Sequence, residues 1–175
     1  MYCFGHLIEG AVAYFQATGK DKLLKAAERF ADYVAANFGT EEGKLHGYPG
    51  HEIAEMALVR LYELTGKEKY LNLARYFVDE RGKRPYYFDQ EHPEEVKKGH
   101  EDELRYFYNQ AHLPVREQDE AFGHSVRAVY LYSGMADVAR LTGDETLYGA
   151  CRRLWDNITE KKMYVTGGIG STHLG

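Results

Sequence analysis

Three histidines, His6, His51 and His124, each follow a glycine and precede an apolar, helix-like segment. An imidazole donates or accepts hydrogen bonds and changes charge near neutral pH, so it can bind a hydroxyl group or move a proton. One histidine near a helix start is usually a structural hydrogen-bonding group. Three at equivalent places in adjacent repeats would point in the same direction. The sequence therefore predicts that these side chains share one central opening.

Other short motifs lack the residues that their chemistry requires. The segment from His51 to Glu55 begins like a helical zinc-protease motif, but a glutamate stands where the second histidine belongs. Gly167–Gly170 is glycine-rich without the lysine of a phosphate loop. Ser125 directly follows His124, but neighbours in a helix point to different sides, so the two residues do not form the serine–histidine pair of a catalytic triad. Two cysteines, Cys3 and Cys151, are too few for a paired-cysteine zinc site. We expect no metal site within this chain.

A repeated turn determines the elements that must position the histidines. Thr-Gly followed by charged residues and then an apolar position occurs at Thr18-Gly19, Thr65-Gly66 and Thr142-Gly143. Glycine accepts the left-handed conformation that ends a helix, and an acidic residue follows each turn, where a helix N-terminus favours negative charge. The repeat unit is therefore a helix, a tight turn and a second helix.

The apolar spacing differs between the two helices of each unit. After the first turn, one helical face is predicted to carry the apolar residues Leu23, Ala27, Phe30, Ala31, Val34 and Phe38. The helices before the turns are apolar on most sides, as in Ile53–Tyr62. We interpret the first helices as inner and the second as outer. The predicted fold is all-α, with three consecutive hairpins forming part of an (α/α)6 barrel.

A long non-periodic stretch at about 82–121 separates the second hairpin from the third. Its portion from Glu91 to Lys98 is too polar to pack and is predicted to be a solvated loop or short helix. Its later portion combines rings, amides and charges, and includes Gln110 and His112. Long ordered loops often line sites, although surface packing is the alternative. We predict that this inserted region lines the pocket.

Composition narrows the classes of partner. The 175 residues carry 22 Lys+Arg and 27 Asp+Glu, a net charge of −5 that opposes binding to nucleic acid or an anionic membrane. No apolar run is long enough to span a bilayer, and a signal-peptide pattern is not recognisable at Met1–His6, so we expect a cytoplasmic protein. The 15 tyrosines suit a site for a half-polar ligand, although helical bundles also bury tyrosine.

Five segments in order along the chain resemble the bacterial β-L-arabinofuranosidases of glycoside hydrolase family 127. They are Gly5-His6-Leu7-Ile8-Glu9, Gly47-Tyr48-Pro49-Gly50-His51, Gln110-Ala111-His112-Leu113-Pro114-Val115-Arg116-Glu117-Gln118, Gly123-His124-Ser125-Val126-Arg127-Ala128 and Tyr164-Val165-Thr166-Gly167-Gly168-Ile169-Gly170-Ser171. The resemblance implies an (α/α)6 catalytic barrel and retaining hydrolysis of a β-linked L-arabinofuranoside in arabinose-containing glycans. It also implies that His6, His51 and His124, with Gln110 and His112 as weaker candidates, contact the sugar.

The same resemblance implies that bond-making groups lie outside these residues. In the family, the acid/base glutamate directly follows the Gly-Gly-Ile-Gly-Ser segment, and the zinc-binding residues and the cysteine nucleophile come later. Residues 1–175 would thus be a single partial toroid with no catalytic residue and no cofactor of its own, zinc belonging to the parent enzyme. Alone it would be inactive, and its open edge would favour homo-oligomers.

Two alternatives remain open at this stage. A row of helical hairpins can be a protein-binding scaffold, which would not require three histidines in register. The (α/α)6 fold also hosts sugar epimerases and unsaturated-uronide hydrolases, for which Glu55 or Glu117 would be the candidate acid/base. The order of the five segments favours the arabinofuranosidase interpretation over both.

Overall fold

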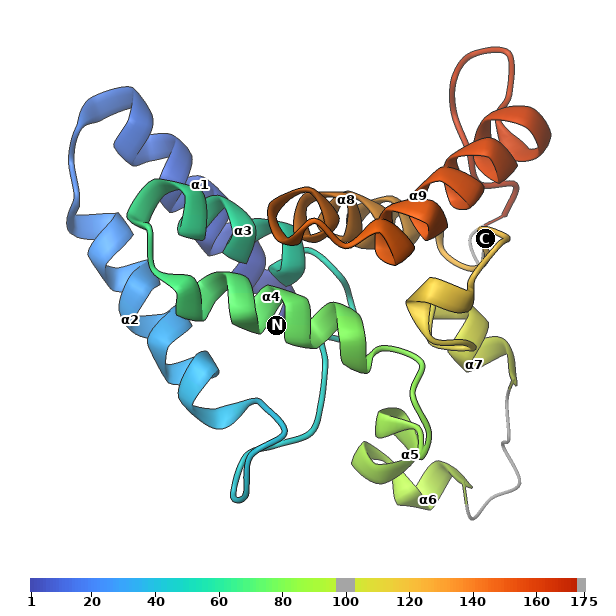
Figure 1. The fold of residues 1–175 in the computed structure, drawn as a ribbon, viewed down its shortest axis with the longest axis horizontal. Coiled ribbons are helices and arrows are strands. Elements are labelled where there is room, and N and C mark those ends of the chain that lie inside the picture. Colours follow the sequence, from blue (N-terminus) through green and yellow to red (C-terminus); the bar gives the residue numbers. More distant parts are fainter. Residues whose placement is uncertain (97–102, 173–175) are drawn as a thin grey trace.

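Six long helices form three hairpins in the computed structural model, which describes residues 1–96 and 103–172 (Figure 1). The hairpins pair α1 (Tyr2–Thr18) with α2 (Lys22–Asn37), α3 (Ala54–Thr65) with α4 (Glu68–Glu80), and α8 (Ser125–Thr142) with α9 (Glu145–Asn157). A π-helical turn, η2 (Ile158–Lys162), extends α9. Within the described ranges, no helix has both the length and the apolar character needed to cross a bilayer.

The three Thr-Gly turns end their helices as predicted. Gly19, Gly66 and Gly143 have φ angles of 69°, 69° and 66°, the left-handed region that glycine occupies without a steric penalty. Each glycine N–H donates to a carbonyl in the last turn of the preceding helix. This confirms the predicted helix-turn-helix unit.

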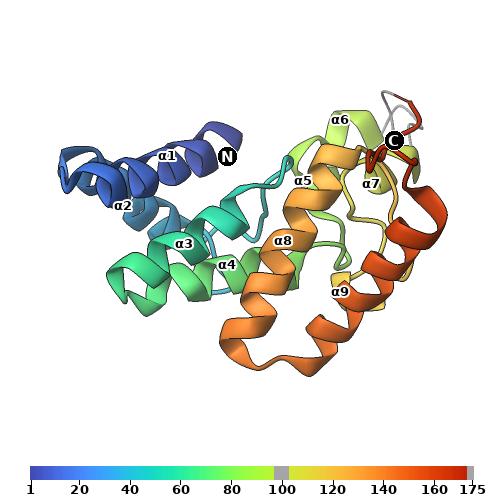
Figure 2. The same cartoon turned by 90° about the horizontal axis from the view of Figure 1, so that it is seen from above.

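The first helices of the hairpins pack on one another. α3 contacts α1 on one side and α8 on the other, while α2 contacts α4 (Figure 2). Two glycines allow the close approach: a Cβ at Gly5 of α1 would lie 2.7 Å from Ile53 Cγ2, and one at Gly134 of α8 would lie 2.8 Å from Glu55 Cβ. The start of α3 is therefore clamped between its two neighbours.

The predicted apolar face of α2 is only partly correct. Ala27, Ala31 and Val34 are buried, but Leu23 and Phe30 are 39% and 42% exposed. Spacing alone placed them on the core face, whereas α2 lies in an end hairpin whose outer edge has no neighbouring hairpin among the described residues. Leu24, which the pattern omitted, is buried instead.

The stretch 82–121 contains short helices that the sequence pattern did not show. They are α5 (Tyr87–Glu91), α6 (Pro93–Val96), α7 (Glu103–Tyr108) and the 3-10 turn η1 (Val115–Glu117). Each is too short for a periodic pattern to be read from sequence. The polar portion predicted at 91–98 forms α6 over 93–96, while its last two residues lie outside the described ranges.

Candidate functional site

The structure brings His6, His51 and His124 together. The rings of His51 and His124 are 6.4 Å apart between centroids. His6 and His51 share two ring neighbours, since each lies 4.5 Å from Tyr2 and 6.1 Å from Tyr130. The first turn of α1 lies against the start of α3, since a Cβ at Gly5 would lie 3.0 Å from Ala54 N. Figure 1 shows the N-terminus near the middle of the view. We call the three histidines, Tyr2 and Tyr130 the histidine cluster.

The three histidines converge although their positions in the helices are not equivalent. His6 lies inside α1, which begins at Tyr2; His51 precedes α3 by three residues, and His124 is the N-cap residue of α8. The expectation that all three stand at a helix start is therefore wrong for His6. α1 begins one turn earlier than the Gly-His motif suggests.

The His51 ring is held by the backbone of the next residue. Its Nδ1 lies 2.7 Å from the carbonyl oxygen of Glu52. Burial lowers the pKa of His51 below its ordinary value, and the hydrogen bond to Glu52 opposes this shift, while the nearby charge of Arg127 and the other two histidines add to it. A lowered pKa keeps this imidazole neutral at physiological pH.

Arg127, one turn after His124, ties the cluster to two loops. Its Nη1 donates to Gly50 O at 2.7 Å and to Asn109 Oδ1 at 2.8 Å. Its guanidinium lies 4.7 Å from the ring centroid of Tyr108, and that ring contacts His124 at 5.6 Å. Sequence reasoning missed this residue as a functional candidate, although it stands in the quoted segment that begins at Gly123.

A buried charge cluster supports the loop that carries His51. Arg81 is fully buried, and its Nη1 and Nη2 lie 2.9 Å from Glu52 Oε1 and 3.3 Å from Glu55 Oε1. The guanidinium also donates to Pro49 O at 2.6 Å and to Asn109 O at 2.8 Å. Both glutamates are fully buried as well. We call Arg81, Glu52 and Glu55 the buried ion cluster.

The buried ion cluster makes stability depend on pH. Burial raises the pKa of Glu52 from 4.5 to about 8, although the positive charge of Arg81 opposes the shift. A carboxyl whose pKa is higher in the folded state stabilises the fold most at low pH, and this contribution is lost as pH rises from about 4.5 through 8. A tenfold change in the proton affinity of a group on folding corresponds to about 1.4 kcal/mol of stability.

We expect the substitution Glu52→Gln to remove this pH dependence. The amide has the shape of the protonated carboxyl and cannot ionise. The stability of the variant relative to the unsubstituted chain should therefore increase by several kcal/mol between pH 5 and pH 8.5, in the direction set by the raised pKa. Urea denaturation across that range measures the difference. A constant difference at all pH values would contradict the expectation.

Gln110 and His112 lie in the loop beside the cluster and have structural contacts. The buried Gln110 amide donates to the carbonyls of Tyr108 and Phe122, which holds the backbone just before Gly123. The His112 ring stacks on Phe107 at 4.4 Å and meets Phe122 edge-on. No ring contact joins His112 to the other histidines within the described ranges. The contacts that the structure shows for these two residues hold the loop in place.

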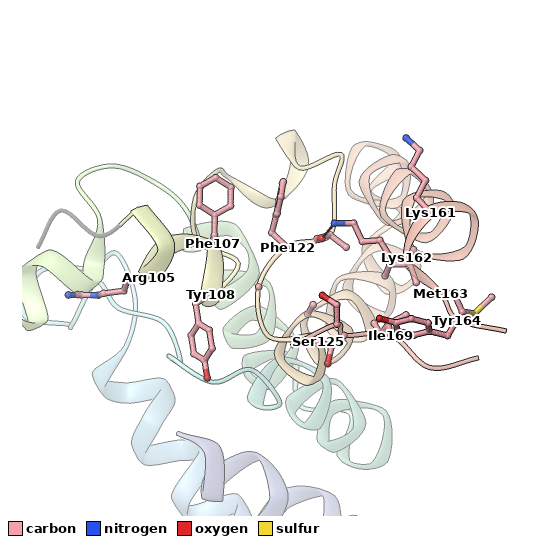
Figure 3. Close-up of a pocket in the computed structure, with 16 residues that line it drawn as sticks. Arg105, Phe107, Tyr108, Phe122, Ser125, Lys161, Lys162, Met163, Tyr164 and Ile169 are labelled. Atoms are coloured by element: carbon pink, nitrogen blue, oxygen red, sulfur yellow. Dashed lines mark hydrogen bonds between the residues drawn. The ribbon is translucent and has the colours of Figure 1, made fainter. Parts of the chain in front are cut away.

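A cavity of about 1100 Å³ lies next to the histidine cluster, not within it. Figure 3 shows Phe107 and Tyr108 extending in opposite directions from α7, with Ser125 and the 161–169 segment across the opening. Tyr108 lines the cavity and contacts His124, so the two features share a wall. Arg105, Phe107, Tyr108 and Ala121 come from the 82–121 stretch, which thus supplies one side of this space.

The described residues offer neither a set of zinc ligands nor a reactive cysteine, the two groups that the family resemblance implies for the parent enzyme. Across 1–96 and 103–172, no three His, Cys, Asp or Glu side chains are grouped as metal ligands. Burial raises the pKa of Cys151 to about 11, so its thiol stays protonated, and Cys3 lies exposed on α1. The thiolate is the reactive form of cysteine.

The two glutamates considered as alternative acid/base groups also lack a suitable position. Glu55 is fully buried, with one oxygen beside Arg81 and the other accepting from the Ile53 N–H at 3.2 Å. The candidate role of Glu55 as a pocket acid/base is therefore wrong, because its two oxygens contact Arg81 and the Ile53 N–H at the start of α3. Glu117 is exposed in η1 and makes no hydrogen bond or ion pair with the histidine cluster within the described part of the chain.

Comparison with known sequences gives one consistent family. The model of the β-L-arabinofuranosidase GH127 catalytic domain matches residues 1–174. A non-reducing end β-L-arabinofuranosidase of Bifidobacterium longum subsp. longum is 47% identical over 182 aligned residues. The alignment covers 100% of this chain and 27% of that relative, so the chain spans about a quarter of the length of the protein it matches.

Comparison with solved structures gives the same family as the comparison of sequences. A GH127 β-L-arabinofuranosidase of Geobacillus stearothermophilus T6 superposes with a TM-score of 0.92 at 52% identity, covering 99% of this chain and 28% of that one. Another GH127 β-arabinofuranosidase superposes with a TM-score of 0.85 at 49% identity, covering 99% and 25%. These matches confirm the predicted fold class, in which the three hairpins are part of an (α/α)6-type helical domain.

Proposed function

The chain belongs to the GH127 β-L-arabinofuranosidase catalytic-domain family, and on that premise we propose that it forms part of the sugar-binding pocket of a β-L-arabinofuranosidase. The observation that supports this most directly is the convergence of His6, His51 and His124 from three separate hairpins. A helical scaffold does not need imidazoles gathered in this way, whereas a sugar presents several hydroxyls that imidazoles can bind.

The cluster combines the two properties that hold a sugar. A neutral imidazole can accept from one hydroxyl or donate to another, and the lowered pKa of His51 favours the neutral form. Tyr2 and Tyr130 add flat rings on which the apolar face of a sugar can pack while their hydroxyls remain available. Gln110 and His112 would act indirectly, by holding the loop before His124.

We further propose that bond cleavage requires groups outside these residues. Retaining hydrolysis needs a proton donor for the leaving oxygen and a nucleophile for the anomeric carbon. The protonated Cys151 thiol and the buried Glu55 carboxylate suit neither role. Zinc, the nucleophile and the acid/base group would belong to the remainder of the parent enzyme, since the matched relative is much longer.

An activity assay tests this division of roles. The purified 175-residue chain, shown by circular dichroism to be helical, is incubated with an aryl β-L-arabinofuranoside, and release of the aryl group is followed. The full-length Bifidobacterium relative is the positive control. We expect no release above the buffer rate from the chain alone. Turnover comparable to that of the relative would contradict the proposal.

The exposed apolar side chains support a proposal about self-association. The large ones on helices lie on the two end hairpins, and none lies on α3 or α4, which the structure describes in full. Among them are Tyr33 on α2 at 66% exposure and Trp155 on α9 at 68%. Burial of such side chains favours association. We propose that the isolated chain forms dimers or larger oligomers, and a monomer by light scattering at high concentration would argue against this.

A further inference from the structure

The hydrogen bond of His51 determines which of its ring nitrogens carries the proton. Nδ1 lies 2.7 Å from the Glu52 carbonyl oxygen, and a carbonyl oxygen only accepts hydrogen bonds. Nδ1 must therefore be the protonated nitrogen when this bond forms. In a neutral ring, Nε2 is then a bare acceptor. Nε2 has no hydrogen-bond partner among the described residues, so it is available to a ligand.

The carbonyl that fixes this tautomer is itself fixed by the buried ion cluster. The Glu52 side chain turns into the core, where its Oε1 lies 2.9 Å from Arg81 Nη1. The same guanidinium donates through Nη2 to Pro49 O at 2.6 Å. Arg81 thus holds the chain on both sides of His51, two residues before it and one residue after it.

The backbone next to this carbonyl is in a conformation that needs support. Ile53 has a φ of 155° with ψ of −30°, which is rare for a β-branched residue. Its N–H donates to Glu55 Oε2 at 3.2 Å, and Glu55 Oε1 contacts Arg81. Unfavourable backbone conformations persist only where surrounding contacts over-determine them, and they occur often at functional sites. The buried ion cluster supplies those contacts.

We propose that Arg81 and Glu52 are positioning residues, which hold the Glu52 carbonyl so that His51 presents Nε2 as a hydrogen-bond acceptor to a ligand hydroxyl. An acceptor nitrogen binds the O–H of a neutral sugar and is repelled by the oxygens of a carboxylate. The inference rests on the proposed function only for the identity of the ligand; the tautomer and its cause are properties of the chain itself.

The test is the tautomer of His51, measured by long-range ¹H–¹⁵N correlation of the imidazole nitrogens in the ¹⁵N-labelled chain at pH 8. The His51 signals are assigned by their loss in His51→Gln. We expect a protonated Nδ1 and an unprotonated Nε2. A His51 ring with the proton on Nε2, or an even mixture of the two tautomers, would overturn the proposal.

Two substitutions at one position separate positioning from simple stabilisation. In Glu52→Ala the backbone loses its anchor, so we expect a mixture of tautomers. The affinity for methyl β-L-arabinofuranoside should fall by up to about tenfold, the effect of losing one neutral hydrogen bond. Glu52→Gln retains a neutral hydrogen-bonding side chain of the same shape and should restore both properties. An unchanged His51 tautomer in a folded Glu52→Ala variant would overturn the proposal.

Arg116→Lys provides the matched control. Arg116 also bridges two carboxylates, Asp79 and Asp144, at 2.7 Å each, but within the described part of the chain it makes no hydrogen bond or ion pair with residues 47–53. Its substitution should leave the tautomer unchanged; a mixture in this variant would assign the effect to general loosening and count against the proposal. If the tautomers behave as expected and no variant binds the sugar, the proposed function fails while the positioning role stands.

Discussion

Arg81→Met is expected to cost the chain a large part of its stability. The substitution removes the cation that lies between Glu52 and Glu55, both fully buried, and leaves their polar atoms in an apolar interior. Removing one partner of a buried ion pair typically costs about 3–5 kcal/mol, against a total of about 5–15 kcal/mol for a folded domain. Pro49 and Asn109 would lose their hydrogen bonds as well. The free energy of unfolding in urea measures the loss.

Arg116→Met is the appropriate comparison for this result. Arg116 pairs with Asp79 and Asp144, but its side chain is 30% exposed, so water can solvate the carboxylates after the substitution. Partly exposed pairs contribute about 1 kcal/mol or less. Equal losses of stability in the two variants would show that burial of the Arg81 cluster is not what makes it important.

Gly123→Ala is also expected to be strongly destabilising, and it acts directly beside His124. Gly123 has a φ of 75°, a conformation that costs a residue with a Cβ about 1–2 kcal/mol. A Cβ there would also lie 2.2 Å from the Phe107 carbonyl oxygen and 2.7 Å from the Tyr108 Cα. Relieving such overlap costs about a further 1–3 kcal/mol and must move one of the two segments.

Gly143→Ala, at the other end of the same helix, separates the conformational cost from the cost of steric overlap. Gly143 has a similar φ of 66°, but apart from its own chain neighbours no described residue has an atom within 4 Å of an added Cβ. The Gly143→Ala variant should therefore lose only the stability that the positive φ costs, and the contact between Tyr108 and His124 should remain. Denaturation of both variants gives the energies, and the His124 imidazole signal reports displacement. Equal effects of the two substitutions would contradict the close contact at Gly123.

The hairpins were predictable because their signals are local. Each Thr-Gly turn lies within a few residues of the helix it ends, and the apolar spacing of each helix is visible in a single window. The convergence of His6, His51 and His124 followed from the repetition of one motif, even though the helix start near His6 was misplaced. Local repetition was thus sufficient to place residues that are more than a hundred positions apart.

The buried contacts that support the site could not be predicted from the sequence in the same way. Arg81 meets Glu52 across 29 residues and Asn109 across 28, and no spacing rule connects them. In sequence, Arg81 looks like one more surface charge before a glycine, yet it is among the largest fully buried side chains. Leu23 and Phe30 show the opposite error, since periodicity indicates which face is apolar but not whether a neighbour covers it.

The central claim is that His6, His51 and His124 contact one sugar together. It is tested most directly by titrating methyl β-L-arabinofuranoside into the ¹⁵N-histidine-labelled chain and following the imidazole signals. We predict that these three signals shift along one saturation curve, while those of His46 and His92, which are exposed elsewhere, stay unchanged. Signals of the three histidines that remain fixed at saturating sugar, or that shift no more than those of His46 and His92, would contradict the claim.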